Sequence, residues 1–276
     1  MTTDHTIGET AGWQNPLPGR LHKPVFGLFL LWLALALVML VLGIAWPESA
    51  SGLDGLLWPL AAATTLVSLA RRLPLQNVVG VALVAAGLGL TALWIGALTD
   101  VPFGRREFTD RLGERLPGRV PWALPFLWIT LTVTCRGVAR LILRPWRKLT
   151  FYGLWVMALA TGLALLFDLA LEPLAHARGW WRWETTPHTL TWHTAPWVNF
   201  LGWVLTTLAI YGFSTPWLLN KQPVKQPTDW HPLFVWSLLI FFLAIGCAIN
   251  GAWAAGAVIL VGGSLTVVFA IRGGRW

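Results

Sequence analysis

The sequence predicts an all-α protein that crosses a membrane with about eight helices. Of the 276 residues, 56% are hydrophobic and only 12% are charged, and the mean hydropathy is +0.62. A soluble domain needs a larger charged fraction to form its solvated surface. The apolar runs are continuous and about 20 residues long, which is the length of a membrane-spanning helix and unlike the alternating segments of a membrane barrel. Composition and run length therefore agree on a polytopic helical membrane protein.

The expected helices follow one another with short connections. Residues 1–24 are polar and contain several glycines and prolines, so we expect them to form a tail, and residues 25–276 to form a single transmembrane domain. Almost nothing separates the last two apolar runs, which predicts a tight helical hairpin around Asn250 and Gly251. The expected spans are Phe26–Trp46, Leu53–Ala70, Val78–Leu98, Val120–Leu143, Thr150–Leu174, Pro196–Leu219, Leu233–Asn250 and Ala252–Ile271.

The net charge of +8 does not indicate a nucleic-acid partner, because the Lys and Arg residues lie in short loops at the ends of apolar runs. Membrane topology and contact with lipid headgroups explain these charges better. Most of the 20 Lys and Arg residues fall on one side when the amino terminus is placed in the cytoplasm. The sequence thus predicts an integral protein of the bacterial inner membrane with both termini in the cytoplasm.

The segment Val101–Arg119 between the third and fourth spans carries charges of both signs. Its apolar residues recur at roughly helical spacing, which favours an amphipathic helix lying at the membrane interface. A solvated linker is the alternative.

Two acidic residues, Asp168 and Glu172, lie inside the fifth apolar run, and His176 follows one turn later. Residues four apart on a helix point to nearly the same side, so these three residues form one polar line, and Thr161 lies close to the same bearing. Ionisable side chains in hydrocarbon are costly and usually mark a functional site. A carboxyl in apolar surroundings beside a second carboxyl favours its protonated form, which is the form that a general acid needs.

Two simpler interpretations of the acidic residues stay open at this point. The carboxyls could lock their helix to a neighbour through hydrogen bonds, or they could pair with an arginine such as Arg178 or Arg182. His176 could be an ordinary polar cap near the helix end.

Tryptophan is unusually dense after the acidic residues, at Trp180, Trp181, Trp183 and Trp203. Tryptophan gathers at membrane interfaces whatever the function, but indole faces also stabilise a nearby cation. On the sixth span, Asn199 shares a face with Trp203 and could hold a water molecule or a carboxyl. Capping of the helix after a proline is the alternative role for Asn199.

The pattern Asp168-x3-Glu172-Pro173, then Gly179-Trp180-Trp181-Arg182-Trp183, then Pro196-x2-Asn199-Phe200-x-Gly202-Trp203 resembles the membrane-bound carotenoid biosynthesis family, which includes the CruF-type carotenoid hydratases. The resemblance is specific over residues 167–203 and rests on hydropathy and length elsewhere. It implies a hydro-lyase that adds water to the terminal carbon–carbon double bond of an acyclic, lycopene-like carotenoid and forms a tertiary alcohol without an organic cofactor.

The resemblance also implies roles for the residues already singled out. One carboxyl would protonate the alkene and the other would deprotonate the attacking water. The implied partners are the acyclic carotenoid, membrane lipids and other enzymes of carotenoid biosynthesis. The catalytic set would be Asp168, Glu172, His176 and Asn199, and the substrate-binding set Trp180, Trp181, Trp183, Trp203 and Thr161.

Three other functions fit parts of the sequence. The same protonation would lead to a cyclase if an internal double bond attacked the cation before water did. A proton-coupled transporter could use Asp168 and Glu172 as a relay, although no inverted repeat is visible. A non-catalytic membrane scaffold is the third. The chain has no Cys/His cluster with the spacing of a metal site, so we expect no metal.

Overall fold

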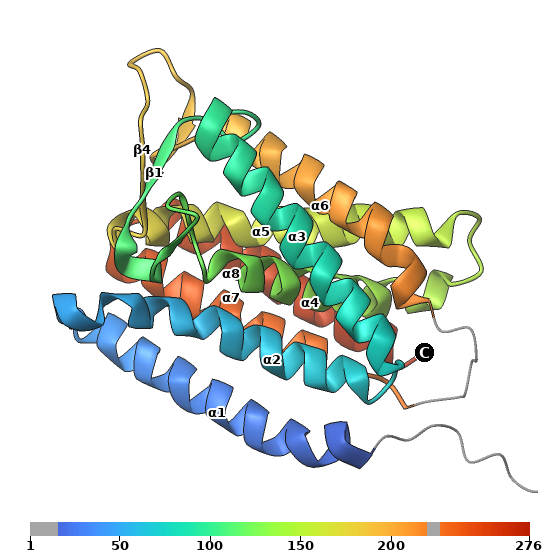
Figure 1. Cartoon of the computed structure of the whole chain (residues 1–276). Coiled ribbons are helices and arrows are strands. Elements are labelled where there is room, and N and C mark those ends of the chain that lie inside the picture. Colours follow the sequence, from blue (N-terminus) through green and yellow to red (C-terminus); the bar gives the residue numbers. More distant parts are fainter. Residues whose placement is uncertain (1–15, 220–226) are drawn as a thin grey trace, which may run out of the picture.

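The structure is a computed structural model that describes residues 16–219 and 227–276, and over these residues eight helices are long and apolar enough to cross a membrane (Figure 1). The predicted fold class and helix count are confirmed. The helices are α1 (Pro16–Val41), α2 (Leu57–Ala70), α3 (Leu75–Thr99), α4 (Leu124–Ile142), α5 (Tyr152–Ala177), α6 (Trp197–Leu218), α7 (His231–Ile249) and α8 (Trp253–Gly274), with short 3-10 turns η1 (Glu48–Leu56), η2 (Asp110–Leu112) and η3 (Arg144–Trp146).

The first helix begins at Pro16, earlier than the expected Phe26. Proline is tolerated in the first turn of a helix, where its missing N–H has no intrahelical partner, and α1 continues past Pro24. Residues 16–24 of the expected polar tail are therefore helical, and the remainder of that tail lies outside the described residues.

Helix α4 forms the centre of the bundle. It contacts α2, α3, α5, α7 and α8, and its apolar stretch is the most buried of the eight described spans. Helix α1 lies at the periphery, against α2 and α7, and Figure 1 shows it along the outside of the bundle. Helix α5 packs against α4, α6, α7 and α8, and most of its buried residues lie in its carboxyl-terminal half.

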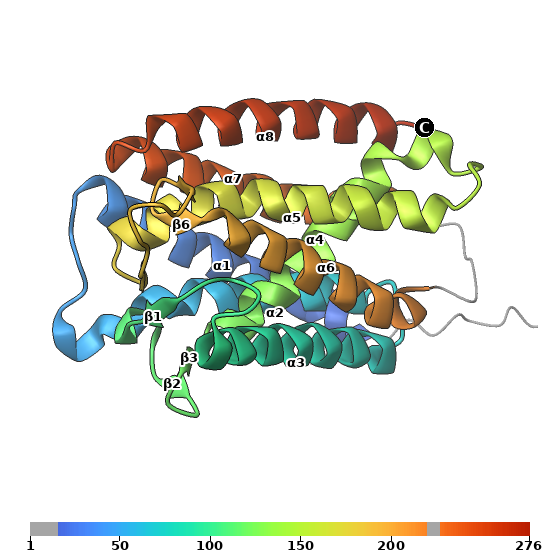
Figure 2. The same cartoon turned by 90° about the horizontal axis from the view of Figure 1, so that it is seen from above.

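The beginning of α1 and the end of α8 lie at the same end of the bundle. His22 in α1 contacts His231 at the start of α7 with ring nitrogens 3.2 Å apart, and Arg144 donates to the carbonyl of Gly274 at the end of α8. A chain that crosses the membrane an even number of times begins its first span and ends its last span on the same side. Figure 2 shows the carboxyl terminus at the end of the bundle away from the strands.

At the opposite end, the connecting loops form three two-stranded antiparallel sheets. The sheet nearest the acidic residues pairs β1 (Arg106–Phe108) with β4 (Trp181–Trp183), so that Arg106 lies opposite Trp183 and Phe108 opposite Trp181. The other two sheets pair β2 (Arg115–Leu116) with β3 (Val120–Pro121), and β5 (Thr191–Trp192) with β6 (Ala195–Pro196).

The expectation of an interfacial helix over Val101–Arg119 is wrong. Gly104, Gly113 and Gly118 adopt positive φ angles, which interrupt a helix and which glycine adopts at little cost. The backbone of this segment instead bonds to β4 and folds back over the bundle end. The apolar side chains that it buries are Phe103, Phe108 and Leu112.

Candidate active site

Asp168 and Glu172 lie one turn apart on the inward face of α5, and both side chains are 0% exposed. They are the only acidic residues among the described ones that are completely buried. Burying an ionised carboxylate is costly unless hydrogen bonds or a counter-charge compensate it. The surroundings of the pair therefore determine what the pair can do.

Asn199 connects the two carboxyls from the neighbouring helix. Its side-chain amide nitrogen donates to Oδ2 of Asp168 at 3.0 Å and to Oε1 of Glu172 at 2.9 Å. Asn199 is itself 0% exposed and lies in the first turn of α6, just after Pro196. Asn199 does not cap the helix, because its side-chain oxygen, the atom that would accept a backbone N–H, has no hydrogen-bond partner among the described residues, and its nitrogen contacts the acidic pair.

Strand β4 covers Glu172 with two indole rings. Trp181 and Trp183 both donate their Nε1–H to Oε2 of Glu172, each at 2.8 Å. Alternate residues of a strand point to the same face, so a three-residue strand presents both indoles to one carboxyl. Hydrogen bonds to an ionised acceptor are short and roughly twice as strong as neutral ones, which makes this pair of donors a strong anchor for a carboxylate.

Arg106 brings a positive charge to the same region. Its Cζ atom lies over the rings of four aromatic residues, at 4.9 Å, 4.6 Å, 5.8 Å and 5.3 Å from the ring centroids of Phe103, Phe108, Trp181 and Trp183 respectively. The residue as a whole is half-buried, but Nη2 of its guanidinium is shielded from solvent and has no hydrogen-bond partner among the described residues. A guanidinium stacks well on aromatic faces, which explains the aromatic cage.

Burial lowers the pKa of Arg106 to about 10, and the negative charges of Glu172 and Asp168 act in the opposite direction. Arg106 therefore stays positively charged at neutral pH. One fixed positive charge and two carboxyls occupy the same enclosed space, so the site is electrically balanced when one of the carboxyls carries a proton.

Thr161 on α5 and Trp203 on α6 are also buried. Oγ1 of Thr161 and Nε1 of Trp203 have no hydrogen-bond partner among the described residues. Trp203 lies one turn after Asn199 on α6, and its ring packs on Trp128 of α4 with centroids 4.5 Å apart. Gly202 leaves room for the ring of Phe103, which a Cβ atom at that position would meet.

The structure separates two predicted residues from the acidic pair. His176, expected on the same polar line, is exposed and lines an open groove with Arg111, Arg178 and Arg182 outside the buried cluster. The helix ends at Ala177, one residue after His176, so this side chain has left the packed part of α5. Trp180 is buried, but its Nε1 donates to Oδ2 of Asp54 at 3.0 Å rather than facing the carboxyls.

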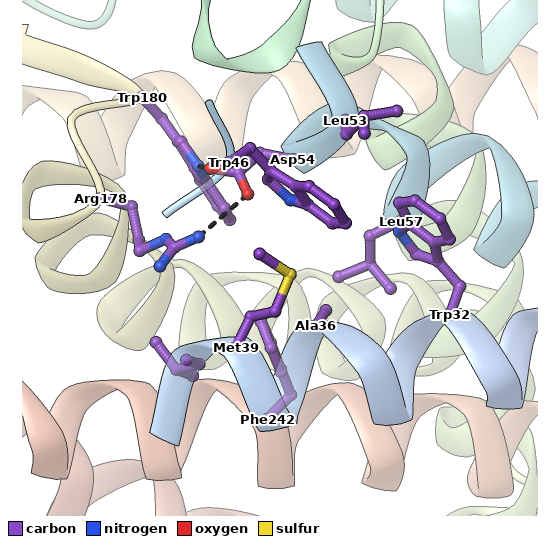
Figure 3. Close-up of a pocket in the computed structure, with 11 residues that line it drawn as sticks. Trp32, Ala36, Met39, Trp46, Leu53, Asp54, Leu57, Arg178, Trp180 and Phe242 are labelled. Carbon is purple, nitrogen blue, oxygen red and sulfur yellow. Dashed lines mark hydrogen bonds and ion pairs between the residues drawn. The ribbon is translucent and has the colours of Figure 1, made fainter. Parts of the chain in front are cut away.

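The two arginines considered as partners of the acidic pair are occupied elsewhere. Arg178 forms an ion pair with Asp54 at 3.0 Å, and Figure 3 shows this contact at the edge of a small cavity of about 20 Å³ between α1, η1 and Trp180. Arg182 is exposed on β4, opposite Glu107 on β1. The idea that either arginine neutralises Asp168 or Glu172 is therefore wrong.

Sequence reasoning missed Arg106, because the segment around it was interpreted as a helix or a linker. A signal was available. Arg106 and Phe108 alternate as residues on one face of a strand do, and so do Trp181 and Trp183. The segments 106–108 and 181–183 both alternate in this way and both lie in loops on the same predicted side of the membrane. They could therefore have been predicted to pair as two strands.

Comparison with known proteins decides the family. The family model described as "Carotenoid biosynthesis protein" matches residues 53–269, which is most of the chain and contains every residue of the buried site. The chain belongs to this family. The stretch from 167 to 203 that carries the resemblance lies within the matched region.

One curated relative is the bisanhydrobacterioruberin hydratase of Haloarcula japonica, which is 33% identical to this chain over 129 residues. The match covers 44% of this chain and 42% of the relative, so the chain matches less than half of that protein's length. The comparison with solved structures gives no significant match.

Proposed function

We propose that this protein is a carotenoid hydratase that adds water to the terminal carbon–carbon double bond of an acyclic, lycopene-like carotenoid and releases a tertiary alcohol. The observation that carries the proposal is the buried Asp168–Asn199–Glu172 cluster, in which one amide contacts both carboxyls inside a membrane-embedded bundle. The family match and the name of the hydratase relative support the substrate class and the reaction.

The reaction requires an acid, a base and shelter for a cation. Protonation of the less substituted alkene carbon gives a tertiary carbocation, and the oxygen of a water molecule then attacks this cation. A base removes one proton from the attacking water, so the carotenoid gains one molecule of water in total. In our proposal Asp168 and Glu172 supply the acid and the base, and Asn199 holds them in register.

The indole rings near the cluster differ in the groups that their faces and their N–H groups contact. The faces of Trp181 and Trp183 are turned to Arg106, and their N–H groups are turned to Glu172, so we assign them to the carboxylate. Trp203 lies one turn from Asn199 with its N–H free of a partner among the described residues. We propose Trp203 as the ring that stabilises the cation, with Thr161 deeper along the substrate tail.

The test is expression in a bacterium that accumulates lycopene, followed by mass analysis of the pigments. The expected product is heavier than lycopene by one molecule of water. Asp168→Asn and Glu172→Gln should each abolish it, whereas Glu184→Gln, which changes an exposed acid in a surface ion pair, should not. A new pigment of unchanged mass would indicate a cyclase, and full activity of both buried-acid variants would contradict the proposed mechanism.

We propose further that both termini lie in the cytoplasm and that the site lies near the outer leaflet of a bacterial inner membrane. The end of the bundle that holds the start of α1 and the end of α8 also carries Arg71, Arg72, Arg147 and Lys148, in agreement with the positive-inside rule. Reporter fusions check this topology. Activity of a cytoplasmic reporter inserted between residues 184 and 190 would overturn it.

A further inference from the structure

The two buried carboxyls differ in their hydrogen-bond surroundings, and this difference assigns their protonation states. Glu172 accepts three N–H donors, two on Oε2 from Trp181 and Trp183 and one on Oε1 from Asn199. Asp168 accepts one donor, on Oδ2 from Asn199, and its Oδ1 has no partner among the described residues.

An ionised carboxylate only accepts hydrogen bonds, at about four lone-pair sites, whereas a neutral carboxyl also has one O–H to donate. Three donors aimed at one carboxyl favour its charged form, since the charged form binds each of them more strongly. A buried carboxyl with one donor has little to compensate a charge, and its free oxygen is the place where a proton can sit. The donor inventory therefore favours an ionised Glu172 and a neutral Asp168.

Charge balance leads to the same assignment. Arg106 carries one positive charge within the aromatic cage that covers Glu172, and its electrostatic interaction extends to both carboxyls. One cation compensates one buried anion, and a second buried anion would remain uncompensated, which is energetically costly. The cage rings that contact Arg106 include Trp181 and Trp183, the two residues that donate to Glu172, so the cation lies on the Glu172 side of the pair.

We infer that Asp168, through Oδ1, is the proton donor of the reaction, and that Arg106 is a positioning residue that keeps Glu172 ionised as the base. The catalytic part of this inference rests on the proposed function. The proton on Oδ1 passes to the alkene carbon and leaves Asp168 ionised. Water then forms the new carbon–oxygen bond, and its surplus proton goes to Glu172, where Oε1 has only one donor and retains a lone pair. Transfer of that proton from Glu172 to Asp168, one helical turn away, restores the starting state.

Infrared spectroscopy on the purified wild-type protein without substrate tests the assignment. A neutral carboxyl gives a C=O stretching band that an ionised one does not, and a heavy carbon isotope at the side-chain carboxyl lowers its frequency. We expect such a band at neutral pH that shifts when aspartate is labelled and stays in place when glutamate is labelled. Asp168→Asn should remove the band, and Asp100→Asn, at an exposed position, should leave it.

The role of Arg106 has its own readout. Arg106→Gln removes the compensating charge, so a second neutral-carboxyl band that shifts with the glutamate label should appear, and Arg106→Lys should restore the single aspartate band. If the role of Arg106 were purely structural, its replacement by Gln would not produce a second band that disappears when Lys is placed there instead.

The outcomes separate the two proposals. A wild-type band that follows the glutamate label, or no band at all, overturns the present inference even if hydrated carotenoid is formed. If the wild type shows the aspartate band but forms no hydrated carotenoid, the proposed function and the catalytic role of Asp168 are both wrong. The assignment of a neutral Asp168 and an ionised Glu172 in the protein without substrate would then still hold.

Discussion

The side-chain nitrogen of Asn199 lies 2.9 Å from Oε1 of Glu172, and this contact joins α6 to α5 at the depth of the buried acidic pair. The same nitrogen also reaches Asp168 at 3.0 Å. Asn199 is thus the only described residue that donates to both carboxyls. The helical turn of α5 sets the spacing of the two acids, and Asn199 ties both of them to α6.

Replacement of Asn199 by Ala should destabilise the protein and abolish most activity. The substitution leaves Oδ2 of Asp168 and Oε1 of Glu172 buried without that donor, at a cost of about 1–3 kcal/mol for each unsatisfied group. Thermal unfolding in detergent should show a lower midpoint. Asn250→Ala, which removes an amide bonded to the carbonyl of Gly246 at an exposed helix end, is the matched control and should unfold near the wild-type temperature.

Trp181→Phe and Trp183→Phe should each reduce product formation while keeping an aromatic ring over Arg106. Each loses one N–H donor to Glu172, and a hydrogen bond to a charged group contributes about 1.5–3 kcal/mol, or about ten- to a hundredfold in rate if the carboxylate acts as base. Pigment yield per amount of membrane protein measures the effect. Trp155→Phe, on the exposed face of α5, provides the control. If all three variants gave the same yield, the hydrogen bonds from Trp181 and Trp183 would have no part in the mechanism.

A disulfide between β1 and β4 should block product formation reversibly. Neither carboxyl is exposed, so an alkene reaches Asp168 only when some of the residues that cover the pair move. Strands β1 and β4 lie in the connecting loops over the pair, and loops move more readily than packed helices. Glu107 and Arg182 are direct cross-strand partners with outward-facing side chains, at a spacing that a disulfide can bridge.

The double variant Glu107→Cys/Arg182→Cys should therefore lose product under oxidising conditions and regain it with reductant in isolated membranes. The double serine variant Glu107→Ser/Arg182→Ser controls for the loss of the native side chains. Unchanged product in the oxidised form would show that the substrate enters without separation of these strands.

Asp54 and Arg178 should show a favourable coupling in a double-mutant cycle. Their 3.0 Å ion pair is largely shielded, with side chains 10% and 18% exposed, and Trp180 donates to the second carboxylate oxygen. We expect a coupling free energy of about 1–3 kcal/mol for Asp54→Asn and Arg178→Gln, measured by unfolding. Zero coupling would mean that this contact does not hold η1 against the end of α5.

The sequence predicted the parts of the fold that depend on one chain segment at a time. Span lengths and hydropathy indicated eight helices, and four-residue spacing placed Asp168 beside Glu172. Contacts between segments far apart in the chain were harder to predict from the sequence. The approach of Asn199 depends on how α5 packs on α6, and the cage around Arg106 depends on strand pairing between two loops. His176 was misplaced because helical periodicity gives a bearing and not burial, and this residue lies in the last turn of α5, beyond the buried part of the helix.

The order of the residues along the chain has a consequence for biogenesis. Asp168 and Glu172 are synthesised before Trp181, Trp183 and Asn199, which supply all four of the hydrogen bonds to them described here. The newly made α5 therefore leaves the translocation machinery with two polar groups that still lack these donors, and ionisable groups in a membrane-spanning helix are costly without partners. Strand β4 then supplies two of these donors and the sixth helix the other two, so completion of the buried cluster favours the pairing of α6 with α5 in the lipid.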